Sequence, residues 1–369
     1  MKRYTIAIAF AVLLSGCETG GIDSKKALAP IPSRTVALMS SKGMSQASPI
    51  VIRSYKMEGE LEIWKLNSEG RYALLKTFPI CRWSGQLGPK KKQGDRQAPE
   101  GFYSITPGQM NPNSSYHLSF DTGFPNAYDR AHGRTGSNLM VHGACSSAGC
   151  FAMTDQAISE IYAIGREAFR GGQRSFQFQS YPFRLTPKNL VKHRMDPNYN
   201  FWKNLKEGSD YFEVTGKEPA VGVCGGRYVF GPTIDGCNPA VNPAVAAKIQ
   251  KDEQEITQLA NNTPAIRLVY QDGGQHRSFR NRSERLQMSR PEAVAEGPRE
   301  VIVGGDSTAL AFSPIQNNDA QTAPTEPAKV ASTKNMTPKK QPQSEEEPMY
   351  RKIMGGITTS VGGLFGSKS

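Results

Sequence analysis

Residues 141–155 read VHGACSSAGCFAMTD, and this stretch decides the interpretation of the rest of the chain. We expect His142 to end a short apolar strand, after which a loop of small residues carries Cys150 to the start of a helix. Thr154 is a suitable N-cap for that helix, and apolar residues recur at helical spacing until Gly171. The pattern predicts a strand, a loop and a helix, with a histidine and a cysteine at the two ends of the loop.

A histidine and a cysteine held by one loop are what nucleophilic thiol chemistry requires. A helix N-terminus presents free N–H groups that lower the pKa of a thiol, and a neighbouring imidazole accepts the proton. We therefore expect Cys150 to be the nucleophile and His142 the general base. Gly149 lets the backbone approach a substrate carbonyl closely, so that the amides of Gly149 and Cys150 form an oxyanion hole.

Two other interpretations of the same residues stay open. The first is a disulfide between Cys145 and Cys150. The second is a zinc ion bound by His142, Cys145 and Cys150. Zinc is less favoured because the sequence shows no CxxC pair and no evident fourth ligand.

Segments typical of strands lie on both sides of this loop. Apolar or alternating stretches are separated by Gly, Asn and Ser residues with turn chemistry, so we expect mainly antiparallel neighbours. The fold class that follows is mostly β with a few helices. The expected strands cover residues 50–52, 61–66, 72–80, 101–105, 116–120, 138–141 and 176–179.

Taken together, these residues resemble the L,D-transpeptidase catalytic domain (YkuD-like), a family of bacterial cell-wall enzymes. The family's motif is a histidine followed, after a loop, by Ser/Thr-His-Gly-Cys. His142 and residues 147–150 (SAGC) match it, except that the loop is very short and Ala148 replaces the second histidine. The pattern is similar to that of the murein transpeptidase-like branch, whose studied members act on the bond joining peptidoglycan to an outer-membrane lipoprotein. The resemblance implies an L,D-transpeptidase-like β-sandwich, with the catalytic cysteine on a strand–loop–helix segment, over residues 48–236.

The resemblance also implies a reaction and its partners. Cys150 attacks the carbonyl of the diamino acid at the third position of the peptidoglycan stem peptide and forms a thioester, with His142 as the base. An amine or water then resolves the thioester. His117 is a candidate substitute for the missing second histidine, although a lone histidine on a strand is more often structural. We expect His117 and Ser147 to bind substrate, a wall-linked outer-membrane lipoprotein to be a further partner, and no cofactor or metal to take part.

The N-terminus has the features of a lipoprotein signal peptide over residues 1–17. Two basic residues precede an apolar run over residues 6–14, which is too short to span a bilayer. Residues 14–17 (LSGC) resemble a lipobox, in which the thiol of Cys17 is lipidated. The alternative is a buried N-terminal helix with an incidental cysteine. We expect an exported, periplasmic protein with a lipid anchor in the membrane, the outer membrane being favoured over the inner one.

Export bears on the remaining cysteines, because unpaired thiols tend to be consumed in an oxidising compartment. Cys224 and Cys237 are candidates for a disulfide. Cys145 is expected to be a small buried residue, and Cys81 has no obvious mate. The redox state of these four residues is left open.

The segments outside residues 48–236 lack the features of a core. Residues 18–47 are small and polar, which predicts a tether with one short helix near residues 36–44. Residues 237–369 are expected to form a low-complexity, largely disordered extension that is dispensable for chemistry, because residues 317–347 contain no aromatic residue. The 45 Lys and Arg exceed the 33 Asp and Glu, for a net charge of +12. Export nevertheless argues against nucleic acid as a partner.

Two rival functions follow from the same residues. One is a hydrolase that releases a wall-bound lipoprotein or trims stem peptides, because nothing in the sequence specifies the acyl acceptor. The other is a non-catalytic peptidoglycan-binding lipoprotein, which is disfavoured because binding alone needs neither His142 nor Cys150. The lysine run at residues 90–92 is a candidate contact for peptidoglycan carboxylates, or else a solvated loop.

Overall fold

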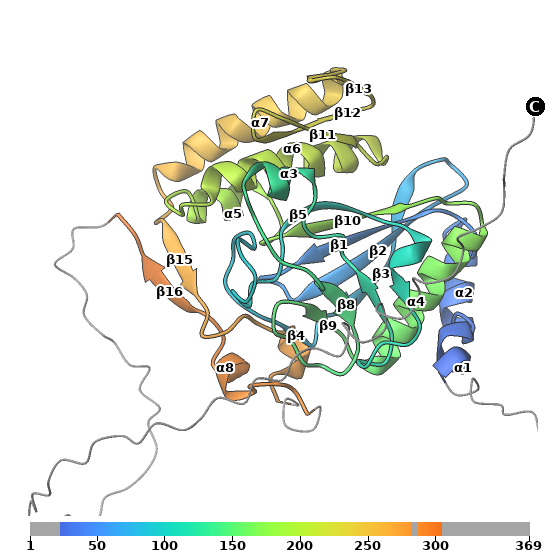
Figure 1. Ribbon diagram of the computed structural model, residues 1–369. Coiled ribbons are helices and arrows are strands. Elements are labelled where there is room, and N and C mark those ends of the chain that lie inside the picture. The colour runs from blue at the N-terminus through green and yellow to red at the C-terminus, as the bar shows by residue number, and fades with distance from the viewer. Residues whose placement is uncertain (1–22, 282–286, 305–369) are drawn as a thin grey trace, which may run out of the picture. The chain divides into compact units, whose positions relative to one another are not determined.

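The structure, a computed structural model, describes residues 23–281 and 287–304 (Figure 1). Two five-stranded sheets form its centre, which confirms the predicted sheet-rich fold. The first sheet has the order β3-β2-β1-β10-β5, with strands β1 (Ile50–Tyr55), β2 (Glu60–Leu66), β3 (Tyr72–Pro79), β5 (Gly101–Ile105) and β10 (Phe176–Tyr181). The second has the order β4-β9-β8-β7-β6, with strands β4 (Arg82–Trp83), β6 (Met110–Asn111), β7 (Ser119–Asp121), β8 (Met140–His142) and β9 (Phe151–Ala152).

Helices and short hairpins surround the two sheets. The helices are α1 (Asp23–Leu28), α2 (Ser33–Ser41), α3 (Ala127–Ala131), α4 (Asp155–Arg170), α5 (Pro187–Lys192), α6 (Tyr199–Thr215), α7 (Pro243–Ala260) and α8 (Glu292–Ala295). Single 3-10 turns cover Pro107–Gln109 and Arg277–Phe279. The hairpin strands are β11 (Ala220–Cys224), β12 (Arg227–Gly231), β13 (Ile234–Asp235), β14 (Asn238–Pro239), β15 (Ile266–Val269) and β16 (Arg299–Ile302).

The two sheets face each other through an aromatic core. Phe176 and Phe178 alternate with glutamines along β10, so that both rings point to the same side of the sheet. Phe120 of β7 meets these two rings edge-on at centroid distances of 5.8 and 6.1 Å, and Phe151 of β9 contacts Phe178 at 5.7 Å. The strands that carry the predicted motif are therefore anchored in a packed core.

Helix α4 begins and ends where the sequence predicts. Thr154 caps it, since its Oγ1 accepts a hydrogen bond from the Ala157 N–H at 3.2 Å, and Gly171 follows its last residue. The helix contacts β7 and β8 of the second sheet. Its buried face contains the apolar residues that recur at helical spacing, among them Ile158, Ile161 and Ile164.

The structure corrects the predicted tether over residues 18–47. Helices α1 and α2 lie in this segment, and Met39 of α2 is only 1% exposed. The Thr35 hydroxyl donates a hydrogen bond to Glu160 of α4 at 2.6 Å. A few buried residues on one helix face are enough to attach the segment to the domain, even though its average composition is polar.

The structure also corrects the predicted domain end at residue 236. Helix α7 packs against α5 and α6, and Lys206 of α6 forms buried ion pairs with Asp210 and Asp252. Farther along the chain, the ring of Tyr270 lies 4.9 Å from that of Trp83 in β4. Apolar and aromatic side chains between residues 243 and 294 therefore bury this segment against the two-sheet domain.

The remaining terminal predictions lie outside the described residues. These are the signal peptide with Cys17 and the part of the predicted extension beyond residue 304. Within the described part of the chain, no helix combines the length and apolar character needed to cross a membrane.

Candidate active site

The sheet places Cys150 and His142 on adjacent parallel strands. Strands β8 and β9 pair in parallel, with Val141 opposite Phe151 and His142 opposite Ala152. Cys150 comes directly before β9 and therefore lies beside Met140. Its Sγ accepts a hydrogen bond from the Met140 N–H at 3.4 Å, which fixes this register.

The alternation of side chains then decides which residues share a face. Val141 and Phe151 are fully buried and belong to the core, so His142 and Cys150 point to the opposite side of the sheet. With strands about 4.8 Å apart and an offset of two residues, their Cα atoms are about 8 Å apart. The imidazole and the thiol are thus diagonal neighbours on one face, as the prediction of a nucleophile and its base requires.

The position of Cys150 differs from the predicted helix start. The cysteine precedes a strand, and α4 begins only at Asp155, so the helix N-terminus does not act on the thiol. Burial raises the pKa of the Cys150 thiol above its usual value of 9.0, and the Asp121 carboxylate adds to this rise. The hydrogen bond from Met140 and the charge of Lys90 oppose it without cancelling it. The resting residue is therefore a thiol, which needs a base.

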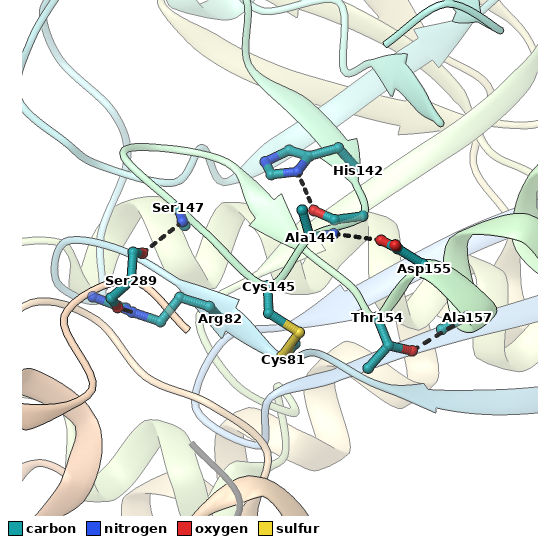
Figure 2. The surroundings of a disulfide bond; sticks show 11 residues. Cys81, Arg82, His142, Ala144, Cys145, Ser147, Thr154, Asp155, Ala157 and Ser289 are labelled. Carbon is teal, nitrogen blue, oxygen red and sulfur yellow. Dashed lines mark hydrogen bonds between the residues drawn. A yellow bond between two sulfur atoms is a disulfide. The ribbon is translucent and has the colours of Figure 1, made fainter. Parts of the chain in front are cut away.

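His142 has the state that a general base needs. Its Nδ1 lies 2.6 Å from the Gly143 carbonyl oxygen, which can only accept, so Nδ1 carries the proton and Nε2 keeps a free lone pair (Figure 2). Burial lowers the pKa of His142 below its usual 6.5, although the bond to Gly143 opposes this effect. The imidazole is therefore neutral at pH 7 and ready to accept a proton.

The loop between these two residues is unusually short. Parallel neighbours generally need a connection of a dozen residues or more, but residues 143–149 suffice here. Ala144 and Cys145 have left-handed backbone conformations, with φ of 64° and 46°. Backbone and side-chain hydrogen bonds hold this turn. The Ala144 N–H donates to Asp155 Oδ1 at 2.8 Å (Figure 2), and the Cys145 N–H donates to the Met153 carbonyl at 3.2 Å.

The disulfides correct two of the expectations for the cysteines. Cys145 is bonded to Cys81, so it is paired with neither Cys150 nor a zinc ion, and Cys81 has a mate 64 residues away (Figure 2). The candidate disulfide between Cys224 and Cys237 is present. Cys150 is a free thiol.

Ser147 holds the loop itself, and its contacts give no support to its predicted role in substrate binding. The residue is buried, and its Oγ donates to the Cys150 carbonyl at 2.7 Å. The same oxygen accepts from the N–H groups of Cys150 and Gly149, at 3.2 and 3.4 Å. Neither amide is free to bind a substrate oxyanion in this arrangement, so the predicted oxyanion hole would require the Ser147 hydroxyl to turn away.

His117 lies against helix α4. Its Nε2 is 2.8 Å from the Ser159 hydroxyl, and its Nδ1 is 3.8 Å from an oxygen of Asp155. These contacts attach the residue to the start of the helix and give no support to its predicted role as a substitute histidine or substrate ligand.

The neighbouring Tyr116 was missed by sequence reasoning. Its ring lies 4.8 Å from that of His142, and the tyrosine is 49% exposed. It therefore covers the base while remaining open to a substrate. A tyrosine in a polar stretch gives no local signal for such a contact.

The lysine run divides into two parts. Lys90 is buried, and its ammonium group pairs with Asp95 at 2.5 Å, whereas Lys91 and Lys92 are exposed. Lys91 and Lys92 therefore lie on a solvated loop, as the second alternative predicts, whereas the contact with peptidoglycan carboxylates stays a prediction. Lys90 contributes its charge near Cys150.

Comparisons with known proteins identify the family of this chain. The model of the L,D-transpeptidase catalytic domain (YkuD) matches residues 65–168, which include both His142 and Cys150. The chain is 41% identical over 244 residues to "Putative L,D-transpeptidase YafK" of Escherichia coli (strain K12), an alignment that covers 66% of this chain and 96% of the relative. The protein of the same name in Escherichia coli O157:H7 gives the same values.

Solved structures are more distant. The helical cell shape determining protein Pgp2 of Campylobacter jejuni is 13% identical, with a TM-score of 0.30 over 63% of this chain and 80% of that one. Bd1075 of Bdellovibrio bacteriovorus is also 13% identical, with a TM-score of 0.26 over 60% of this chain and 74% of that one. Scores this low carry no argument, and the assignment rests on the domain match and on YafK. The chain belongs to the L,D-transpeptidase (YkuD) family.

Proposed function

We propose that this protein modifies peptidoglycan through a thioester between Cys150 and the diamino acid at the third position of the stem peptide. The observation that carries the proposal is the placement of a free thiol and a neutral, Nδ1-protonated imidazole on one face of the β8–β9 pair. Family membership supports peptidoglycan as the substrate. The presence of both the thiol and the imidazole also disfavours the non-catalytic alternative, because binding alone needs neither group.

The proposed reaction uses one base in both halves. As Sγ of Cys150 attacks the carbonyl carbon, its proton passes to Nε2 of His142. The tetrahedral intermediate collapses when the leaving amine takes that proton from His142, and the thioester remains. An amine or a water molecule then attacks the thioester, gives its proton to His142, and releases Cys150 as a thiol.

The test is to incubate the full-length protein with purified peptidoglycan, with and without attached lipoprotein, and to identify the products by mass. New peptide bonds identify a transferase, and released lipoprotein or trimmed stems identify a hydrolase. Cys150→Ala must abolish every product while binding peptidoglycan as before. If the wild-type protein leaves peptidoglycan unchanged, the proposed reaction is wrong and the non-catalytic binding function is the remaining alternative.

We also propose that the protein is exported and anchored through a lipid on Cys17, with the outer membrane favoured. Residues 6–17 support this proposal by their sequence. The two disulfides support an oxidising compartment, where such bonds persist. Mass analysis of the mature N-terminus should show a lipidated Cys17, and an intact Met1 would contradict the proposal.

A further inference from the structure

The loop between His142 and Cys150 contains two residues in an unfavourable backbone conformation. The left-handed conformation at Ala144 and Cys145 is unfavourable for residues with a Cβ atom, so external contacts must hold it. These contacts decide the relative position of the base and the thiol, because the loop joins the ends of β8 and β9.

The Cys81–Cys145 disulfide is the covalent contact among them. Cys81 comes directly before β4, and its N–H donates to the Ala152 carbonyl at 2.9 Å. Strand β4 in turn pairs with β9, with Arg82 opposite Ala152. The disulfide therefore ties the left-handed turn to the strand that borders β9, and the loop is attached on both sides of the nucleophile's strand.

The C-terminal segment closes over this bond. Phe279, Met288 and Val294 form one buried apolar cluster with the two cysteines. Ser289 reaches the second half of the loop, where its Oγ accepts a hydrogen bond from the Ser147 N–H at 3.0 Å (Figure 2). Ser147 is the residue whose hydroxyl bonds to both backbone groups of Cys150.

We propose that the Cys81–Cys145 disulfide is a positioning element of the active site, with Ser289 as a second positioning residue, and that the enzyme works at full rate only when this bond is oxidised. The inference rests on the proposed function in so far as it concerns turnover. In this proposal the disulfide takes no part in the chemistry and acts only by holding His142 and Cys150 in register.

Reduction is the step that would switch the site. A dithiol reductant attacks the disulfide, forms a mixed disulfide, and leaves as a cyclic disulfide, so that two electrons and two protons pass to Cys81 and Cys145. The left-handed turn then lacks its covalent attachment. Small displacements between reacting groups have large effects on rate, so catalysis should fall before the fold is lost.

The experiment compares the full-length wild-type protein with Cys81→Ser/Cys145→Ser, a double variant that cannot exchange disulfides with Cys150 through either partner. The matched control is Cys224→Ser/Cys237→Ser, which removes the disulfide of the β11–β14 region. Two properties are measured: kcat and KM on a soluble stem-peptide fragment, and the pH profile of Cys150 alkylation by iodoacetamide, followed by mass at the peptide that contains it. Thermal unfolding shows that each variant is folded.

We expect the Cys81/Cys145 variant to lose about tenfold or more in kcat with KM nearly unchanged. Its alkylation profile should also shift relative to wild type, because the imidazole no longer faces the thiol. The control variant should keep both properties. Wild-type protein in which dithiothreitol has reduced Cys81 and Cys145, as verified by mass, should behave as the Cys81/Cys145 variant does, and reduction of Cys224–Cys237 alone should have no effect.

An unchanged kcat together with an unchanged alkylation profile would overturn the inference, as would equal losses in both disulfide variants. If the Cys81/Cys145 variant does not fold, Ser289→Ala is tested in its place. This variant should have a lower kcat and a shifted alkylation profile. Ser289→Thr keeps the hydroxyl and should have the wild-type kcat and profile. A wild-type protein that is inactive on stem peptides refutes the proposed function, and the alkylation profiles then decide the inference alone.

Discussion

The hydroxyl of Ser147 lies 2.7 Å from the carbonyl oxygen of Cys150 and donates to it, while the Cys150 N–H donates back to the same hydroxyl at 3.2 Å. The residue that holds the backbone of Cys150 is thus three positions before it in the chain. Cys150 is held through its backbone, in addition to the hydrogen bond that its Sγ accepts from the Met140 N–H.

Ser147→Ala should therefore lower both stability and activity. The change leaves the N–H groups of Gly149 and Cys150 and the Cys150 carbonyl without this partner, which costs about 1–3 kcal/mol of unfolding free energy. Urea unfolding measures this loss, and turnover per folded molecule should fall as well. Wild-type turnover in a destabilised variant would show that the bonds stabilise the loop without placing the thiol.

Replacing His142 tests the assignment of the base. His142→Ala should lower kcat about 100- to 10,000-fold, because the buried thiol then has no group to take its proton. Thioester formation can be followed by intact mass. A variant that acylates at the wild-type rate would mean that another group deprotonates Cys150.

The pH profile of kcat/KM should have its acid limb below pH 6.5. Burial lowers the pKa of His142, so the base loses its proton at a lower pH than a free histidine does. The depressed pKa of His142 also makes the free energy of unfolding depend on pH. The contribution of His142 to that free energy is fully present above about pH 6.5 and is lost as the pH falls toward the pKa of the folded state. An acid limb above pH 7 would contradict the neutral state of His142.

Tyr116 should protect the base. Tyr116→Ala exposes the ring of His142 to water and should move the acid limb toward higher pH, whereas Tyr116→Phe keeps the ring contact and should leave it in place. Profiles of kcat/KM for the two variants make the comparison. If the two variants have equal pH profiles of kcat/KM, Tyr116 acts only in packing or in substrate contact.

Two truncations separate the folded segment from the end of the chain. A chain that stops after residue 241 loses Asp272, which pairs with Arg82, and the apolar cluster on the Cys81–Cys145 disulfide. It should be unstable or inactive on soluble stem peptides. A chain that stops after residue 304 keeps every described contact and should retain wild-type turnover. Full activity of the shorter chain would show that the predicted domain end at residue 236 is correct.

The predictions from sequence succeeded where the signal is local. The Thr154 cap, the periodic isoleucines of α4 and the alternating phenylalanines of β10 each depend on residues within a few positions of one another. The short loop between His142 and Cys150 also indicated that these two residues lie close together, as the β8–β9 pairing shows. These features are readable because backbone geometry alone relates the residues involved.

The failures concern contacts between distant segments. Nothing near Cys81 indicates a partner 64 residues away, and nothing near Ser289 indicates a hydrogen bond to Ser147. The cysteine's predicted place at a helix start failed because the two-residue strand β9 lies between Cys150 and α4. The C-terminal boundary failed because the composition of residues 317–347 was extended to a segment that can bury apolar side chains.

The oxidation pattern has a consequence for maturation. In chain order, the cysteines of the described domain are Cys81, Cys145, Cys150, Cys224 and Cys237, and the native disulfides leave the middle one unpaired. If the cysteines were joined strictly in the order of synthesis, Cys81 and Cys145 would form the native disulfide, but Cys150 would then form a non-native disulfide with Cys224. A buried thiol with a raised pKa forms little thiolate and exchanges slowly. The raised pKa of Cys150, for which the proposed mechanism supplies a base, thus also slows its disulfide exchange while the later pair forms.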